Sequence, residues 1–162
     1  MDQNPYAPPK TRVSDLAPGD GRPVASEVPL YAPNQVAVAT FLASALAGAW
    51  LMAANFRATG QPHKTRNSWW IGLAVTLATF AVGFVLPDKF PNVVLPLGVA
   101  FGIRALAERH FTVILAEHEK AGGELRSWWR VIGICLLVLA IMFGVGFVGV
   151  LGYYFIEGFA AG

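Results

Sequence analysis

Four apolar stretches, separated by short polar segments, follow one another after residue 35. Residues 36–56 form a run of 21 without a charged side chain, and residues 131–156 form a run of 26. A helix rises about 1.5 Å per residue and the hydrocarbon layer of a bilayer is about 30 Å thick, so runs of this length can cross it. The pattern predicts a transmembrane helix over each of these two stretches.

The two middle stretches are shorter. Residues 69–86 give 18 uncharged positions, and residues 90–103 give 14 before Arg104. We predict that both are spans, the third because Arg104 lies near its end, where a long side chain can reach the membrane surface. Residues 111–120 then predict a helical extension that runs along or out of the interface, which the glycines at 122–123 should stop.

Short motifs recur along the chain and indicate an internal duplication. Ser68-Trp69-Trp70 returns as Ser127-Trp128-Trp129, each copy just before a long apolar stretch. Pro33-Asn34 and Pro91-Asn92 open matching segments at an offset of 58, and Val-Gly-Phe-Val closes them at an offset of 63. The predicted fold class is therefore all-α: an integral membrane four-helix bundle built from two duplicated helical hairpins, residues 35–89 and 90–162.

Residues 1–34 contain seven of the eleven prolines and no apolar periodicity, which predicts a disordered tail. The tail lacks the basic start and apolar region of a cleavable signal peptide, so the first membrane helix is expected to direct insertion. Residues 4–9 are either a polyproline-type docking peptide or a solvated leader without a partner.

Small side chains mark the predicted contacts between helices. Thr40, Ser44 and Gly48 recur every four positions, so they share one face of a helix and let another helix approach closely. Gly98 and Gly102 form a GxxxG pair that matches Thr40 and Ser44 at the offset of 58. These residues predict that the first membrane helix packs on the third.

Aromatic side chains lie where the apolar stretches meet polar segments. Indole and phenol rings suit the headgroup region because the ring is buried while the N–H or O–H stays wet. The predicted interface anchors are Trp69, Trp70, Trp128, Trp129, Tyr153 and Tyr154.

Composition agrees with a membrane protein. Of the 162 residues, 55% are hydrophobic and 14% are charged, whereas a soluble domain has about 25% charged residues. A net charge of +2 is too small to indicate a nucleic-acid partner. Cys135 is the only cysteine, so no disulfide forms within the chain, and we expect it to fill apolar space.

The distribution of Lys and Arg predicts the orientation. The polar segments that precede the second and fourth stretches contain Arg57, Lys64 and Arg66, and Arg104, Arg109, Lys120, Arg126 and Arg130. The opposite side has only Lys89 near the membrane. Because positive loops stay in the cytoplasm, loops 57–67 and 109–127 are expected there and both termini outside, with the two copies related by an axis along the membrane normal.

Three features of the chain carry a resemblance to a known family: Asn4 to Pro9, Leu46-Ala47-Gly48-Ala49 with Asn55-Phe56-Arg57, and the turn 118–123 before Ser127-Trp128-Trp129. In these features the chain resembles small bacterial four-helix membrane proteins that begin with an Asn-Pro-Tyr-x-x-Pro leader. The resemblance implies a multi-pass protein of the bacterial inner membrane and carries over no catalytic residue.

One polar constellation could support chemistry. Imidazole and carboxylate together bind first-row metals or relay protons, and such groups gather in Glu108, His110, Glu117, His118 and Glu119, with His63 from the other loop. No H-E-x-x-H pattern or cysteine pair accompanies them, so we expect a solvated interfacial helix instead. Without a phosphate loop, serine elbow or redox cysteine pair, the chain is not expected to be an enzyme or to hold a cofactor.

By elimination the expected function is a non-catalytic scaffold or interaction partner within a membrane, and the resemblance implies that this is the bacterial inner membrane. Its expected partners are the lipid bilayer and either another membrane protein or a second copy of the chain. The alternative is an oligomeric transporter or channel subunit, since duplicated helical units are a common transporter plan. Against transport, no charged side chain lies in the middle of an apolar stretch.

Overall fold

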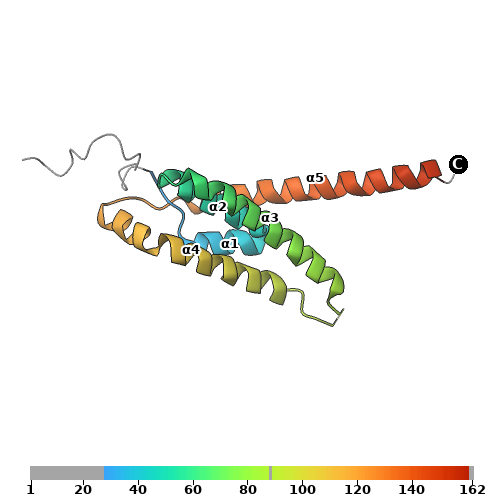
Figure 1. Cartoon of the computed structure of the whole chain (residues 1–162), viewed down its shortest axis with the longest axis horizontal. Coiled ribbons are helices and arrows are strands. Elements are labelled where there is room, and N and C mark those ends of the chain that lie inside the picture. Colours follow the sequence, from blue (N-terminus) through green and yellow to red (C-terminus); the bar gives the residue numbers. More distant parts are fainter. Residues whose placement is uncertain (1–27, 88, 161–162) are drawn as a thin grey trace, which may run out of the picture.

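The computed structural model describes residues 28–87 and 89–160, and within them every regular element is a helix (Figure 1). The helices in chain order are α1 (Pro33–Leu42), α2 (Ala45–Ala58), α3 (Pro62–Val85), α4 (Val94–Lys120) and α5 (Trp128–Ala160). Two of these, α3 and α5, are long and apolar enough to cross a membrane. The predicted all-α class is confirmed.

The first predicted span is two helices instead of one. A Cβ on Gly48 would collide with the side chain of Thr40, although residues eight apart in one straight helix are about 12 Å apart. The chain therefore reverses at residues 43–44, and α2 folds back on α1. The prediction of one membrane-crossing helix over 36–56 is wrong, because the 10 residues of α1 rise only about 15 Å, half of the hydrocarbon thickness.

Ser44 makes this reversal. Its φ is 154° and its ψ is 174°, a region that residues with a side chain rarely adopt. It is also the N-cap of α2, since its Oγ accepts a hydrogen bond from the backbone N–H of Leu46 at 3.3 Å. The side chain that we predicted to lie on a helix face is therefore the one that separates two helices. We call residues 43–44 the hairpin turn.

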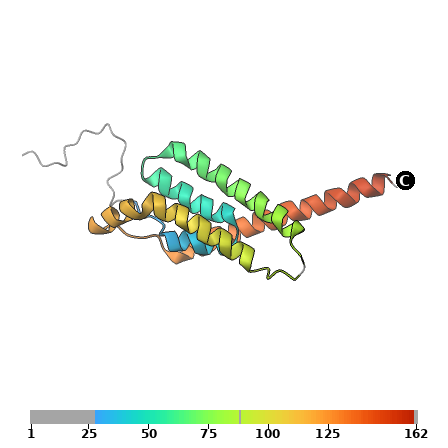
Figure 2. The same ribbon diagram turned by 60° about the horizontal axis from the view of Figure 1, so that its bottom comes forward.

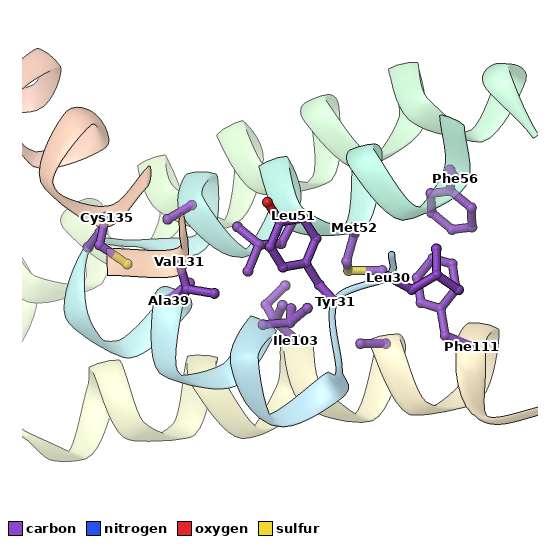
Figure 3. Close-up of a cluster of buried hydrophobic side chains, with 14 of the residues drawn as sticks. Leu30, Tyr31, Ala39, Leu51, Met52, Phe56, Ile103, Phe111, Val131 and Cys135 are labelled. Carbon is purple, nitrogen blue, oxygen red and sulfur yellow. The ribbon is translucent and has the colours of Figure 1, made fainter. Parts of the chain in front are cut away.

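The α1–α2 hairpin lies at the centre, and the longer helices surround it (Figure 2). α3 packs mainly along α2, α4 packs mainly along α1, and the first part of α5 contacts both. Figure 3 shows side chains from these elements meeting in one cluster, among them Leu51, Ile103 and Val131. The buried stripe of α4 follows the helical period, with Ile103, Ala107, Phe111 and Leu115 four residues apart.

The contact between α2 and α3 depends on small residues. The buried positions of α3 are Ser68, Gly72 and Thr76, again four apart. A Cβ on Gly72 would meet the Cβ of Ala49 and would lie 3.1 Å from the carbonyl oxygen of Ala45. The two backbones therefore approach each other more closely than any larger side chain would allow.

One end of the molecule collects the chain entry and two of the loops. Leu30 forms a parallel β-bridge with Leu125, and Tyr31 is hydrogen-bonded to Asn55 near the end of α2. We call this the loop end, made of residues 28–32, 59–61 and 121–127. Residues 28–32 therefore lie at the same end of the molecule as residues 59–61 and 121–127, and the orientation of the termini relative to a membrane stays a prediction.

The prediction of a disordered tail over residues 1–34 is wrong for its last residues. Leu30 and Tyr31 are buried, and α1 already begins at Pro33. The rest of the tail, including the leader at 4–9, lies in residues 1–27, outside the described part of the chain. The predicted stop after α4 is confirmed, since α4 ends at Lys120 and Gly122 has a φ of 77°.

The outer half of α5 extends beyond the other helices (Figure 1). Residues 143–158 are all exposed. In the most apolar part of α5, and in that of α3, only 17% of the residues are buried. Insertion of these helices in a membrane and the duplication stay predictions. The matching segments have different structures in the described part of the chain. The first segment forms two helices, α1 and α2, whereas the second forms the single helix α4.

Candidate functional site

The open end of the α1–α2 hairpin is closed by one side chain. Asn55 is 1% exposed. Its Oδ1 accepts a hydrogen bond from the backbone N–H of Tyr31, and its Nδ2 donates one to the carbonyl of Tyr31, each at 2.8 Å. The amide therefore pairs both backbone groups of a buried residue, each of which would cost about 1–3 kcal/mol if left unpaired.

Arg126 joins this closure to the loop before α5. Its backbone N–H donates to the carbonyl of Leu30 at 2.8 Å, and its Nε donates to the carbonyl of Pro29 at 2.9 Å. Its own carbonyl accepts from Nε2 of Gln35 at 2.6 Å, and its guanidinium lies 5.4 Å from the ring centroid of Tyr31. The start of α1 and the start of α5 are thereby held together, although they are distant in sequence.

His118 orders the turn after α4. The imidazole is fully buried, and its Nε2 lies 3.0 Å from the carbonyl oxygen of Glu124. A carbonyl can only accept a hydrogen bond, so this nitrogen carries a proton. Gly123 lies so close to the imidazole that a Cβ there would collide with it. His118 is therefore built into the fold of the loop end.

The hypothetical cluster for metal or proton chemistry is not assembled. Among the described residues, no three His, Cys, Asp or Glu side chains come together as metal ligands. His110 packs against the ring of Phe56, with centroids 5.6 Å apart, while His118 points inward on its turn. Glu108 instead pairs with Arg104 at 2.8 Å.

The predicted packing residues lie in three different environments, of which the hairpin turn, with Ser44, is one. Thr40 and Gly48 meet each other inside the hairpin, and a Cβ on Gly48 would lie 3.1 Å from Cγ2 of Ile103. The Cβ positions of Gly98 and Gly102 have no neighbour within 4 Å among the described residues. α1 does pack along α4, but through the stripe that contains Ile103.

The predicted interface anchors are exposed. Trp69, Trp70, Trp128 and Trp129 lie in the parts of α3 and α5 nearest the loop end, and the ring of Trp69 is 5.6 Å from that of Trp50. Tyr153 and Tyr154 lie in the outer half of α5 with their rings 5.8 Å apart. Their role at a membrane interface stays a prediction.

A cavity of about 170 Å³ lies beside the hairpin turn, lined by parts of α3, α4 and α5. Four hydroxyl side chains contribute to its wall: Thr40, Ser44, Thr76 and Thr79. Thr40 donates to the carbonyl of Val36 and Thr79 to that of Val75. The hydroxyl of Thr76, a residue 5% exposed, has no hydrogen-bond partner among the described residues.

These arrangements depend on residues that the sequence analysis did not single out. Asn55 and Arg126 each hydrogen-bond a segment far away in the chain, and Thr76 lines a cavity together with distant residues, so local pattern carries little information about them. The one available signal was Asn55, a strongly polar side chain at the end of an uncharged run. Comparison of the chain with protein-family models, with curated proteins and with solved structures gives no match.

We predict that Asn55→Ala lowers the free energy of unfolding by about 2–5 kcal/mol, because the N–H and C=O of Tyr31 lose their partners while they stay buried. Thermal or denaturant unfolding of the purified protein in detergent measures this loss. The matched control is Asn67→Ala, at an exposed position on α3, which should change the free energy by no more than about 0.5 kcal/mol. Equal effects of the two substitutions would contradict the role given to Asn55.

Proposed function

We propose that this chain is a non-catalytic, multi-pass protein of the bacterial inner membrane that acts as a scaffold or interaction partner. The observation that supports it best is the exposed apolar surface of α3 and α5, which are long enough to span the hydrocarbon. An exposed apolar surface of this extent needs a lipid or protein partner.

Connectivity makes α4 the third span of this proposal. α3 and α5 both begin at the loop end, so the chain has to return across the bilayer between them. The 27 residues of α4 rise about 40 Å, which is sufficient. Arg104 and Glu108 lie in the middle part of α4 and are paired at 2.8 Å, and this pairing lowers the cost of placing two charges within the membrane.

The α1–α2 hairpin then enters the membrane and returns on the same side. Irregular backbone at membrane depth is tolerated where protein covers it. The hairpin turn meets this condition, because α3, α4 and α5 all contribute to its surroundings. The proposed topology is thus three spans and one re-entrant helical hairpin, in place of four spans.

Charge favours a cytoplasmic loop end. Arg57, Lys64, Arg66, Arg109, Lys120, Arg126 and Arg130 lie at or near it, whereas Lys89 is the one basic residue of the opposite loop. By the positive-inside rule, residues 28–32 are then cytoplasmic and the end of α5 is outside. The sequence alone predicts an N-terminus outside. In the proposed topology residues 28–32 are cytoplasmic instead, because residues 36–56 fold back and do not cross the bilayer.

Single cysteines test this topology. We place them at Val28, Gln61 and Gly158 in a Cys135→Ser background and treat intact and lysed cells with a membrane-impermeant maleimide. Val28→Cys and Gln61→Cys should react only after lysis, and Gly158→Cys should react in intact cells. Label that reaches positions 28 and 61 from opposite sides would mean that residues 36–56 cross the bilayer.

The outer half of α5 is the proposed contact surface. Its side chains are exposed in the chain by itself. Gly144, Gly146, Gly149 and Gly152 allow another backbone to approach closely, as in other membrane helix pairs. Either a second copy of this chain or another membrane protein is the proposed partner.

A photoreactive amino acid at Phe147 should yield a discrete cross-linked product in cells, because this exposed position would face the partner helix. A product of twice the chain mass identifies a second copy, and a product of another defined mass identifies a different protein. The matched control is Ile134, which packs against the core and should give no intermolecular product. A smear without a discrete product at position 147 contradicts the interaction function.

The cavity beside the hairpin turn favours a second candidate function, a subunit of a transporter or channel. Broken helices near the middle of the membrane commonly line substrate paths. The turn lies beside Thr76, roughly halfway along the apolar run of α3. The hydroxyl of Thr76, which has no partner in the described part of the chain, can hydrogen-bond a small polar solute or water in this cavity.

If the chain conducts water or a small neutral solute, proteoliposomes that contain it should swell faster than empty vesicles in stopped-flow light scattering. Thr76→Val should reduce that excess rate while leaving thermal stability unchanged or higher, because it removes an unpaired buried hydroxyl without changing the shape. Thr112→Val, at an exposed position of α4, is the control. Equal swelling of protein-containing and empty vesicles excludes this function.

A further inference from the structure

A second hollow, of about 210 Å³, lies between α2, α3 and α4. α3 and α4 contact each other little, because each packs on a different helix of the hairpin. The hollow thus follows the seam between two surrounding helices. We call it the seam groove, and the lining residues that matter are Lys64, Asn67, His110, Ile71, Ile103 and Leu106.

The seam groove changes character along its length. Lys64 and Asn67 lie in the first two turns of α3, next to the loop end, and His110 faces the same ring of Phe56 as Lys64 does. Further from the loop end the wall is made by aliphatic side chains such as Ile71 and Ile103. One end can therefore bind a polar or anionic group, and the other end can bind only an apolar one.

The polar end is electropositive and lacks a carboxylate. Nζ of Lys64 lies 5.8 Å from the centroid of the Phe56 ring. Among the described residues Lys64 forms no ion pair, and the carboxylate of Glu108 pairs with Arg104. His110 adds an imidazole that can donate a hydrogen bond. The mouth also lies at the N-terminal end of α3, the positive end of its dipole.

We propose that the seam groove binds one anionic phospholipid of the leaflet at the loop end. The phosphate contacts Lys64 and His110, and an acyl chain lies between α3 and α4 against Ile71, Ile103 and Leu106. This proposal rests on the membrane placement proposed above. Basic pockets between membrane helices on the cytoplasmic side are the usual sites for anionic headgroups.

The shape of the groove favours a lipid over a soluble anion. Its apolar part continues onto the exposed side of α3, where Ile71 is half exposed. Trp69 and Trp70 lie just beyond Asn67 along α3 and suit the depth of the headgroups. A soluble phosphate would use the mouth and leave the aliphatic wall without a partner.

The test measures the association of spin-labelled phosphatidylglycerol and spin-labelled phosphatidylcholine with the full chain in phosphatidylcholine bilayers. The wild-type protein should prefer phosphatidylglycerol. Lys64→Gln should lower this preference about fivefold at low salt, the effect of about 1 kcal/mol for one basic residue near a membrane surface. Lys120→Gln removes the same charge at the end of α4, outside the groove, and should change the preference less than twofold.

A second variant separates the acyl chain from the charge. Ile71→Trp keeps every charge, fills the groove from an exposed position and should reduce the preference without altering its dependence on salt. Equal association of both lipids with the wild-type protein overturns the proposal, and so do equal effects of Lys64→Gln and Lys120→Gln. Displacement of the spin-labelled lipid by millimolar inorganic phosphate would assign a soluble anion to the site instead.

Carbonate extraction of the same membranes keeps the two proposals apart. Protein that carbonate releases is not integral, which contradicts the proposed function. Protein that stays in the membrane and shows no preference for phosphatidylglycerol contradicts only the lipid site.

Discussion

The pairing of the Asn55 amide with both backbone groups of Tyr31 is the interaction on which the rest of the structure depends. It closes the open end of the hairpin at the point where α2 would otherwise diverge from α1. Every other helix packs on that hairpin, α3 on one member and α4 on the other. A single buried amide therefore sets the positions of elements that do not contact it.

A central hairpin has consequences for the surface. Because α3 and α4 pack on different members of the hairpin, they meet each other little, and the seam groove lies between them. Because the hairpin is only about 15–20 Å long, α5 has a packing partner for its first half alone, up to Met142. The groove and the unpacked half of α5 thus both follow from the central hairpin, the groove from its two separate packing faces and the unpacked half from its short length.

The sequence predicts the helices that are continuous and misses the one that is broken. The apolar stretches beginning near Trp69, Phe90 and Val131 correspond to α3, α4 and α5, because uncharged runs of that length have few alternatives to a helix. The run at 36–56 is equally compatible with one helix or two, since a pattern of apolar residues does not show whether the chain continues or reverses its direction. The hydrogen bonds of Arg126, and the cavity that Thr76 lines, depend on residues more than 30 positions away, which no local pattern contains.

The two segments that match at an offset of 58 fold differently for reasons visible in their residues. The positions of Ser44, Gly48 and Asn55 correspond to Gly102, Leu106 and Val113. The second segment therefore has no N-cap like the one that starts α2, and no amide like the one that closes the hairpin. It also has a leucine in place of the glycine that lets α1 and α2 meet. With none of these three, a continuous helix satisfies every backbone hydrogen bond, and α4 is that helix. Two segments that share motifs at a constant offset can thus form a hairpin in one case and a straight helix in the other.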